Sequence, residues 1–227
     1  MAEQKYVGMM FSPESIQQIV AGNKTQTRRP VKQSLVEKAA YFYVEEETQY
    51  SSRDKKGSAW LYLDGTFHDH RIPAPVAKGD IIYVKEAWMN NPNYLFQRSQ
   101  GLNHPEHYVK SSVSAQFLEE WPRSWKSRMY MPKAAARHFL EVLDVRVERL
   151  RDISREDAIA EGIQAMPDGM FKDYSGMAKH GFTWEKKSFK TMWDSVNRGK
   201  NRPKWADNPL VFAITFRYLE DHKPAFQ

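Results

Sequence analysis

Residues 139–150 read FLEVLDVRVERL, and their alternation of apolar and charged side chains predicts a long β-strand. Leu143, Val145 and Val147 would occupy one face of this strand, and the charged residues beside them the other face. We therefore expect the fold to be built on a β-sheet.

A short helix is expected directly after this strand. Ser154 and Asp157 match a capping box, which satisfies free N–H groups at a helix start, and Gly162 ends the helix. Glu161 then lies in the last turn, where the helix dipole disfavours a carboxylate. That placement suggests a functional role for Glu161, although a solvated terminal glutamate is the ordinary alternative.

The rest of the chain mixes strands and helices. We expect strands at residues 5–11, 41–44, 60–63, 81–84 and 210–216, and helices at 13–21, 132–137 and 183–197. The long helix would bury Phe189, Met192, Trp193 and Val196. Residues 73–75 are expected to form a linker, and 90–120 a loop. This order predicts an α+β fold, with a mostly antiparallel sheet or barrel and helices at its ends.

Residues 22–29, GNKTQTRR, carry hydroxyl groups and cations but no apolar side chain. Ser12 as N-cap, Pro13 in the first turn and Gly22 at the end predict a helix just before them. Two interpretations stay open. The run is either a solvated turn with stray charges, or a catalytic or anion-binding loop held at the helix end.

The composition limits the possible classes of protein. A length of 227 residues favours one domain, and 41% hydrophobic residues suffice for a core. The absence of cysteine excludes a disulfide framework, a thiolate zinc site and a cysteine nucleophile. No signal pattern or membrane-length apolar run occurs, so we expect a soluble, cytoplasmic protein with no membrane partner.

The net charge of +6 favours a polyanionic partner, nucleic acid above all. Residues 121–138, WPRSWKSRMYMPKAAARH, place aromatic side chains such as Trp125 among cations such as Arg128. Stacking residues among cations suit unpaired bases. The alternative is a loop whose tryptophans fill the core.

Two further groups of residues are candidates for a site. Lys85, Glu86 and Trp88 follow the strand at 81–84, where side chains often line a binding cleft. His68 and His70 share one face of an extended segment, but no third metal ligand is identifiable. We therefore expect neither a metal nor a cofactor.

Four stretches occur together in an order that resembles the ASCH family, most closely its phage and prophage members. They are GNKTQTRR, KGDIIYVKEAW at 78–88, the run 140–163 and the final helix–strand pair. The resemblance covers roughly residues 5–30, 76–88 and 128–218. It implies a single domain with a small mixed or antiparallel PUA-like β-barrel, flanking helices and insertions at 31–75 and 90–127.

The resemblance also implies a chemistry. Some bacterial ASCH proteins hydrolyse N(4)-acetylcytidine with a Lys, a Thr and a Glu, which match Lys24, Thr27 and Glu161 by position. Thr27 would attack the acetyl carbonyl, Lys24 would take its proton, and Glu161 would serve the leaving amine. A flat strand would direct Lys24 and Thr27 to opposite faces. The loop must therefore bend, or Thr25 takes the place of Thr27.

Arg28 and Arg29 would hold a phosphate or carboxylate, because a guanidinium binds such groups with paired hydrogen bonds. The expected partner is a nucleoside or single-stranded nucleic acid, and a protein partner, such as a host factor, stays open. Two hypotheses follow. The chain is a hydrolase of a modified pyrimidine nucleoside, or it is an RNA- or DNA-binding module of phage origin, with ribonuclease activity as a variant of that function.

Overall fold

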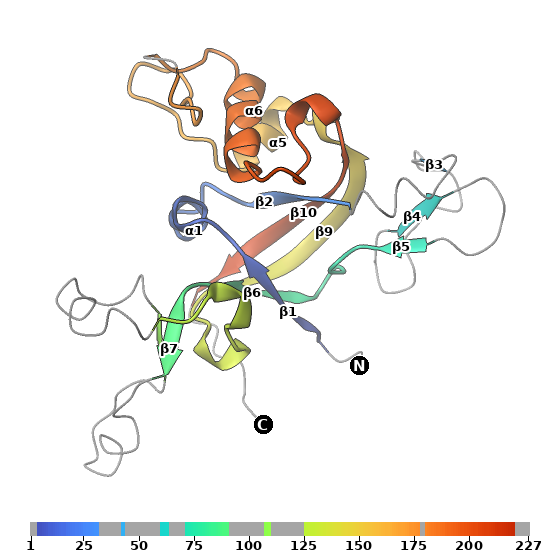
Figure 1. Cartoon of the computed structure of the whole chain (residues 1–227), viewed down its shortest axis with the longest axis vertical. Coiled ribbons are helices and arrows are strands. Elements are labelled where there is room, and N and C mark those ends of the chain that lie inside the picture. The colour runs from blue at the N-terminus through green and yellow to red at the C-terminus, as the bar shows by residue number, and fades with distance from the viewer. Residues whose placement is uncertain are drawn as a thin grey trace, which may run out of the picture. The chain divides into compact units, whose positions relative to one another are not determined.

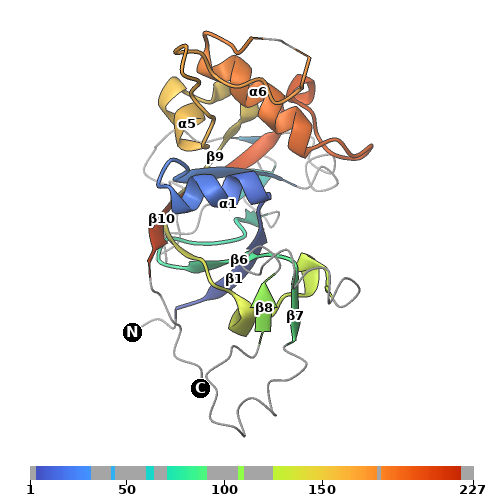
Figure 2. The same ribbon diagram turned by 90° about the vertical axis from the view of Figure 1, so that its left-hand side faces the viewer.

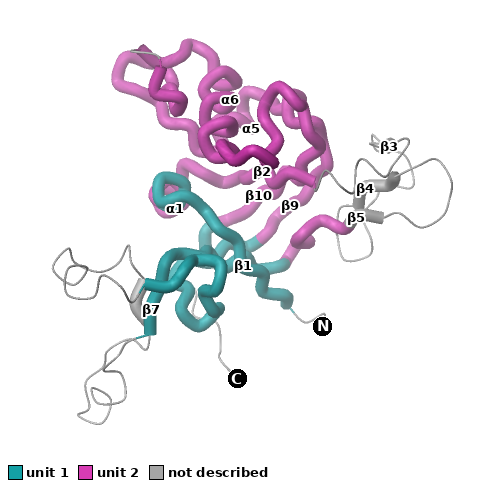
Figure 3. The backbone as a smooth tube through the Cα atoms, in the orientation of Figure 1, with its two compact units in different colours: residues 1–16, 80–141, 218–227 teal, residues 17–79, 142–217 magenta. Residues whose placement is uncertain are grey.

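The computed structural model of this chain describes residues 4–31, 42–43, 60–63, 71–90, 107–109, 125–177 and 180–220. The chain forms two compact units, coloured separately in Figure 3. Unit 1 comprises residues 1–16, 80–141 and 218–227, and unit 2 comprises residues 17–79 and 142–217. The segments 139–149 and 210–219 contribute residues to both units.

The largest sheet has the strand order β1-β6-β9-β10-β2 (Figure 1). Its strands are β1 (Tyr6–Met10), β2 (Gln26–Pro30), β6 (Ile81–Lys85), β9 (Phe139–Arg149) and β10 (Leu210–Leu219). β1 runs parallel to β6, whereas β6 with β9 and β10 with β2 are antiparallel. The fold is therefore mixed α+β, and the strand order of the described residues is open, with β1 and β2 at its edges.

In unit 1, β6 is the buried strand that the run at 81–84 predicts, since Ile81, Ile82 and Val84 are at most 1% exposed. β7 (Trp88–Asn90) pairs with β8 (His107–Val109), within a span expected to be a loop. At residues 90 and 107–109 that expectation was wrong, because a three-residue strand has too short a pattern to detect and is stabilised by pairing with a distant segment. The rest of the span lies outside the described residues. Arg128–Tyr130 and Lys133–Ala135 form single 3₁₀ turns in place of the helix expected at 132–137.

In unit 2, helices α5 (Arg155–Ala160) and α6 (Glu185–Val196) lie side by side on one face of the sheet (Figures 1 and 2). Phe189 and Trp193 of α6 enter the core as predicted, and Met192 packs against it half-buried, but Val196, the last residue of the helix, is 66% exposed. The core of this unit consists of Leu150, Ile153, Ala158, Ile163, Phe189, Trp193 and Val211.

A second, three-stranded antiparallel sheet of unit 2 has the order β3-β4-β5. Its strands are β3 (Phe42–Tyr43), β4 (Trp60–Leu63) and β5 (Arg71–Pro73). The strand expected at 60–63 is confirmed, and the one expected at 41–44 is confirmed at 42–43, the part that the structure describes. Pro73, expected to begin a linker, ends β5. The proposed histidine pair at 68 and 70 lies outside the described residues.

The helix predicted after Ser12 is present as α1 (Pro13–Val20). The Ser12 hydroxyl oxygen accepts a hydrogen bond of 3.1 Å from the N–H of Ser15, which is the contact expected of an N-cap. Gly22 then adopts a φ of 76°, a left-handed conformation that suits glycine at a helix end. In the described part of the chain, no helix combines the length and apolar character needed to cross a membrane.

Candidate functional site

The run at 22–29 leads into β2, an edge strand of the sheet whose first three residues are buried, and is not a solvated turn. β2 pairs with β10 in antiparallel register, with Gln26 opposite Thr215 and Arg28 opposite Ala213. Gln26, Thr27 and Arg28 are only 3–5% exposed. The lack of apolar residues argued against a strand, but here the backbone pairing and bonds between buried polar side chains replace apolar packing.

Lys24 and Glu161, which are 137 residues apart in sequence, meet just before β2. The Nζ atom of Lys24 lies 2.7 Å from Oε2 of Glu161 and 2.7 Å from the backbone carbonyl oxygen of Glu161. Both side chains are 4% exposed. Burial lowers the pKa of the Lys24 ammonium; Glu161 opposes this effect, and the charges of Arg29 and Arg28 add to it.

The local sequence explains how Glu161 reaches this point. The Ser154 hydroxyl accepts a 3.0 Å hydrogen bond from the N–H of Asp157 and so begins α5, as the capping pattern predicts. Glu161 caps the other end, and Gly162 follows with a φ of 82°. A Cβ atom at position 162 would lie 2.8 Å from Cβ of Lys24. Glycine at this position therefore lets the two chain segments approach closely.

Arg28 contacts the second oxygen of the same carboxylate, with 3.2 Å between Nη1 and Oε1 of Glu161. Its other contacts are Nε to Oε1 of Glu148 at 2.8 Å, Nη2 to Oδ2 of Asp157 at 2.8 Å and Nη1 to Oε1 of Gln26 at 2.6 Å. The side chain is fully buried. Burial opposes its charge, but Glu161, Glu148 and Asp157 outweigh that effect and raise the pKa of Arg28.

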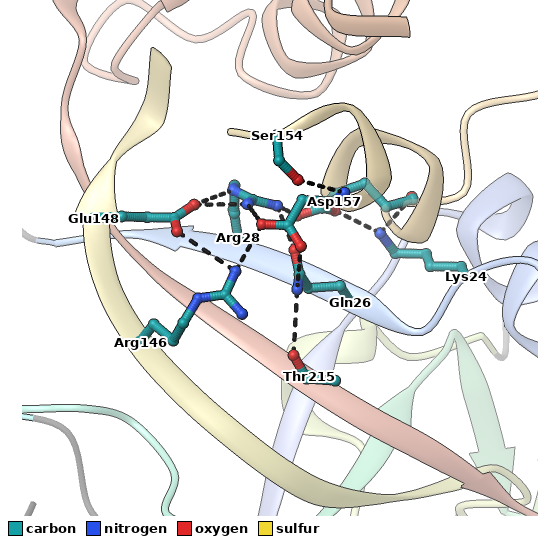
Figure 4. Close-up of polar contacts among 9 residues, drawn as sticks. Lys24, Gln26, Arg28, Arg146, Glu148, Ser154, Asp157 and Thr215 are labelled. Carbon is teal, nitrogen blue, oxygen red and sulfur yellow. Dashed lines mark hydrogen bonds and ion pairs between the residues drawn. The ribbon is translucent and has the colours of Figure 1, made fainter. Parts of the chain in front are cut away.

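A further ring of contacts surrounds Arg28 (Figure 4). Gln26 donates from Nε2 to Oδ1 of Asp157 at 3.1 Å and to the hydroxyl of Thr215 at 3.2 Å. Arg146 donates from Nη2 to Oδ2 of Asp157 at 2.6 Å and reaches Glu148 at 3.5 Å. The cluster thereby joins β2, β9, β10 and the first turn of α5 through polar side chains.

The remaining predicted residues of this run lie differently. Thr27 is 5% exposed, and the alternation of β2 directs its side chain away from the face that carries Gln26 and Arg28. Thr25 is exposed; its N–H donates to the carbonyl of Ala160, and its own carbonyl accepts from Phe216. Arg29 shares the face of Thr27, and burial of its guanidinium lowers its pKa, an effect that Glu161 opposes.

The structure thus brings Lys24, Arg28 and Glu161 together and places Thr27 on the other face of β2. The expectation that Arg28 holds a phosphate does not fit its surroundings, because its donors are used by groups of the protein. Sequence reasoning missed the partners Gln26, Arg146, Glu148 and Asp157. The charged positions of β9 were visible as a pattern, but a pattern does not say which charges are turned inward.

The other predicted residues belong to unit 1. Glu86, which is 6% exposed, accepts two hydrogen bonds of 2.9 Å from Arg137. Trp88 is also 6% exposed and packs with Met131 and Ala135, so its ring fills a core and offers no stacking surface. Lys85 donates from Nζ to the carbonyl of Met129 at 2.7 Å. These three side chains therefore hold unit 1 together.

The basic and aromatic stretch is divided between the interior and the surface of unit 1. Trp125 is half-buried, whereas Arg128 is exposed and donates to the carbonyl of Phe11 at 3.0 Å. Met129 and Tyr130, in the same 3₁₀ turn, are 57% and 72% exposed. The core-filling interpretation fits Trp125 only in part, since its side chain is half-buried, and Trp121 lies outside the described residues. The exposed part of the stretch leaves binding of unpaired bases as a prediction.

Among the described residues, no group of three or more His, Asp or Glu side chains could hold a metal ion. Comparison of the chain with protein-family models, with curated proteins and with solved structures gave no match. The assignment of this site therefore depends on the geometry and chemistry of its own residues.

Proposed function

We propose that unit 2 carries the site of an amidohydrolase for N(4)-acylated pyrimidine nucleosides of the N(4)-acetylcytidine type. In this proposal the sheet is that of a PUA-like barrel of the ASCH family, and Lys24, Thr27 and Glu161 react. One observation carries it. A lysine and a glutamate from distant parts of the chain are 2.7 Å apart, and both are 4% exposed.

The electrostatics of Lys24 suit a general base. A lysine in water stays protonated at neutral pH, but burial lowers the pKa of Lys24 and so increases the share of neutral amine. Glu161 lies within hydrogen-bonding distance and can exchange a proton with that amine. A stability role alone would not require such a pair, because apolar residues of similar volume often stabilise as well.

The reaction balances with these groups. The Thr27 hydroxyl oxygen attacks the acyl carbonyl carbon while its proton passes to Nζ of Lys24. The C–N bond then breaks, and the exocyclic nitrogen of the base leaves with a proton from the Lys24–Glu161 pair. Water hydrolyses the acyl-threonine ester, which releases the carboxylic acid and restores the hydroxyl group. Thr25, whose side chain is exposed, is the alternative nucleophile.

The proposal requires that a nucleoside can reach the reacting side chains. Lys24, Thr27 and Glu161 are each 4–5% exposed. A nucleoside can therefore contact all three only after neighbouring side chains have moved apart and the start of β2 has turned, because Thr27 lies on the face of β2 opposite Lys24 and Glu161. Thr25 imposes a smaller requirement, because solvent already reaches it.

The test is incubation with N(4)-acetylcytidine, followed by its ultraviolet absorbance as cytidine forms. We expect turnover by the wild type, and a loss of roughly 10²- to 10⁴-fold in Lys24→Met and Glu161→Gln. Thr27→Ala and Thr25→Ala identify the nucleophile, because only one of them should abolish turnover. Glu86→Gln, in unit 1, is the matched control. Absence of turnover by folded wild-type protein would contradict the proposal.

A second function, binding of single-stranded nucleic acid, is favoured by the 3₁₀ turn Arg128–Tyr130. The Ser127 hydroxyl caps this turn, and Lys85 donates a hydrogen bond to the Met129 carbonyl. These two contacts fix the backbone that carries the exposed Tyr130 ring. Lys126 and Arg128 supply positive charge beside it. An aromatic platform next to cations suits base stacking combined with phosphate contacts.

Titration of a fluorescent single-stranded RNA at several salt concentrations tests this function. Affinity should fall steeply with salt, and Tyr130→Ala should weaken binding by about 5- to 150-fold, because stacking on one base contributes roughly 1–3 kcal/mol. Trp184→Ala is the control, since Trp184 is a comparably exposed aromatic residue of unit 2. Equal losses in both variants, or binding that is insensitive to salt, would contradict a specific site at this turn.

A further inference from the structure

Within the proposed hydrolase, we propose that Arg28 is a positioning residue. It fixes the orientation of the Glu161 carboxylate, so that one oxygen is presented to Lys24, and it is itself held in place by Asp157 and Glu148. The inference depends on the proposed function for its catalytic meaning, but the coupling between Arg28 and Lys24 can be measured without turnover.

The contacts of Arg28 leave its guanidinium little freedom. A guanidinium has five N–H donors in a rigid plane. In Arg28 the Nε atom and both Nη atoms donate to oxygen atoms of Glu148, Asp157, Gln26 and Glu161, at 2.6–3.2 Å. The side chain is fully buried, so water does not compete for these donors. A group bound along every edge cannot rotate when Glu161 moves.

The two oxygens of Glu161 are divided between two cations. Oε1 lies 3.2 Å from Nη1 of Arg28, and Oε2 lies 2.7 Å from Nζ of Lys24. If Arg28 were absent, Oε1 would lose this buried donor, and the carboxylate could rotate about its terminal bond. By binding Oε1, Arg28 thus keeps the Glu161 carboxylate from rotating, so that Oε2 stays directed at Lys24.

Arg28 also acts on Lys24 through its charge. Its positive charge is one of the smaller causes of the lowered pKa of Lys24, after burial and the charge of Arg29. Removal of that charge should make protonation of Lys24 easier. Because this effect weakens with distance, loss of the charge of Arg146, which lies farther from Lys24, should change the titration of Lys24 less than loss of the charge of Arg28.

The supports of Arg28 come from separate elements. Asp157 lies in the first turn of α5, which the Ser154 cap begins, and Glu148 lies on β9. Arg146 contacts the same two carboxylates from a position 37% exposed. In Figure 4, Arg146 and Lys24 lie at opposite ends of the cluster. Arg146 is therefore a matched control, since it is an arginine of the same cluster but lies far from Lys24.

The first measurement is the pH profile of kcat/KM in three variants. Arg28→Gln removes the charge, so the ascending limb should move to higher pH, and kcat should fall about 10- to 100-fold, as for other supporting residues. Arg28→Lys keeps the charge but not the planar donors, so kcat should fall while the limb moves less. Arg146→Gln should leave the limb in place. A limb that stays in place in Arg28→Gln would overturn the inference.

The second measurement needs no turnover. Lysine labelled with ¹³C at Cε gives a resonance for Lys24, assigned by its loss in Lys24→Met, and its titration is followed by NMR. The midpoint should be higher in Arg28→Gln than in the wild type or Arg146→Gln. An unchanged midpoint in Arg28→Gln, or an equal change in Arg146→Gln, overturns the inference. Absence of wild-type turnover, in contrast, removes the proposed hydrolase and leaves this titration valid.

If Arg28→Gln does not fold, Asp157→Asn provides the remaining test. This variant keeps the shape of the side chain and weakens one of the supports of Arg28. A positioning role predicts a lower kcat with little change in KM, because the substrate contacts are not altered. An unchanged kcat would overturn the inference.

Discussion

Glu86 in unit 1 and Glu161 in unit 2 are buried to the same degree, at 6% and 4% exposure, but they are bound in opposite ways. Both oxygens of Glu86 accept hydrogen bonds of 2.9 Å from the single side chain of Arg137, which is 36% exposed. Glu161 divides its oxygens between Lys24 and Arg28, which are almost wholly buried.

The difference between these two carboxylates shows which kind of buried ion pair can serve as a catalytic site. A bidentate pair satisfies itself and leaves nothing for a substrate to use. A carboxylate shared between a lysine and an arginine has one rigid partner and one partner that can lose its proton. Burial adds to this, because it makes the lysine easier to deprotonate. Only the second arrangement has the parts needed for proton transfer.

The largest contrast should appear when each arginine is removed. Arg28→Met leaves Glu148, Asp157 and Glu161 without their shared partner in the interior, and loss of one side of a buried pair costs about 3–5 kcal/mol. Arg137→Met leaves a single buried carboxylate, that of Glu86, and because Arg137 itself is 36% exposed, water can take its place, so the cost should be only about 1–3 kcal/mol. Urea denaturation of both variants measures the difference. Equal losses of unfolding free energy in the two variants would show that sharing the Glu161 carboxylate between two cations adds nothing to stability.

Close approach of Lys24 to Glu161 should depend on Gly162. Both Gly162 and Gly22 have a left-handed φ, but a Cβ at Gly22 would meet nothing within 4 Å. Gly22→Ala should therefore cost only backbone strain, about 1 kcal/mol. Gly162→Ala adds a clash with Cβ of Lys24, so we expect a total of about 2–4 kcal/mol. Thermal unfolding of the two variants, with the wild type as reference, distinguishes these outcomes; identical shifts would argue against the close contact.

Alkaline pH should stabilise the Lys24 region. The folded-state pKa of Lys24 is lowered from 10.5, chiefly by burial, so between that lower pKa and 10.5 the unfolded chain binds a proton that the folded chain does not. The free energy of unfolding should therefore rise with pH across this window. Lys24→Met should lack that rise, which denaturation at a series of pH values from 7 to about 10 would reveal. A parallel pH dependence in both proteins would contradict the shift.

The smallest effect is expected in unit 1, at His138. This residue is 9% exposed, and its Nδ1 atom lies 2.9 Å from the Tyr218 hydroxyl. Burial lowers the pKa of His138 from 6.5, Arg137 adds to this, and Glu86 opposes it. The unfolded chain then binds more protons just below pH 6.5, so stability should be lost as pH falls through that value. His138→Gln should reduce this loss in acid denaturation, and no change would contradict the assignment.

Local signals in the sequence predicted most elements. The Ser154 cap and Gly162 define α5 because a free N–H group and a left-handed residue are needs of the helix itself, met within a few residues. The apolar run at 81–84 defines β6 for a similar reason. In contrast, β2 has no apolar pattern, and its place in the sheet depends on pairing with β10, which lies far along the chain.

The amino-acid sequence alone therefore determined the approximate positions of α1, α5 and α6 and of the strands other than β2, β5, β7 and β8, and which charged residues the chain contains. It did not determine that Arg28 would be held inside by three carboxylates, nor that Thr27 and Arg28 would lie on opposite faces of one strand. Those outcomes depend on which distant segments β2 contacts. The physical reason is that helix caps and turns are local, whereas the pairing of buried charges is decided only when the whole chain has packed.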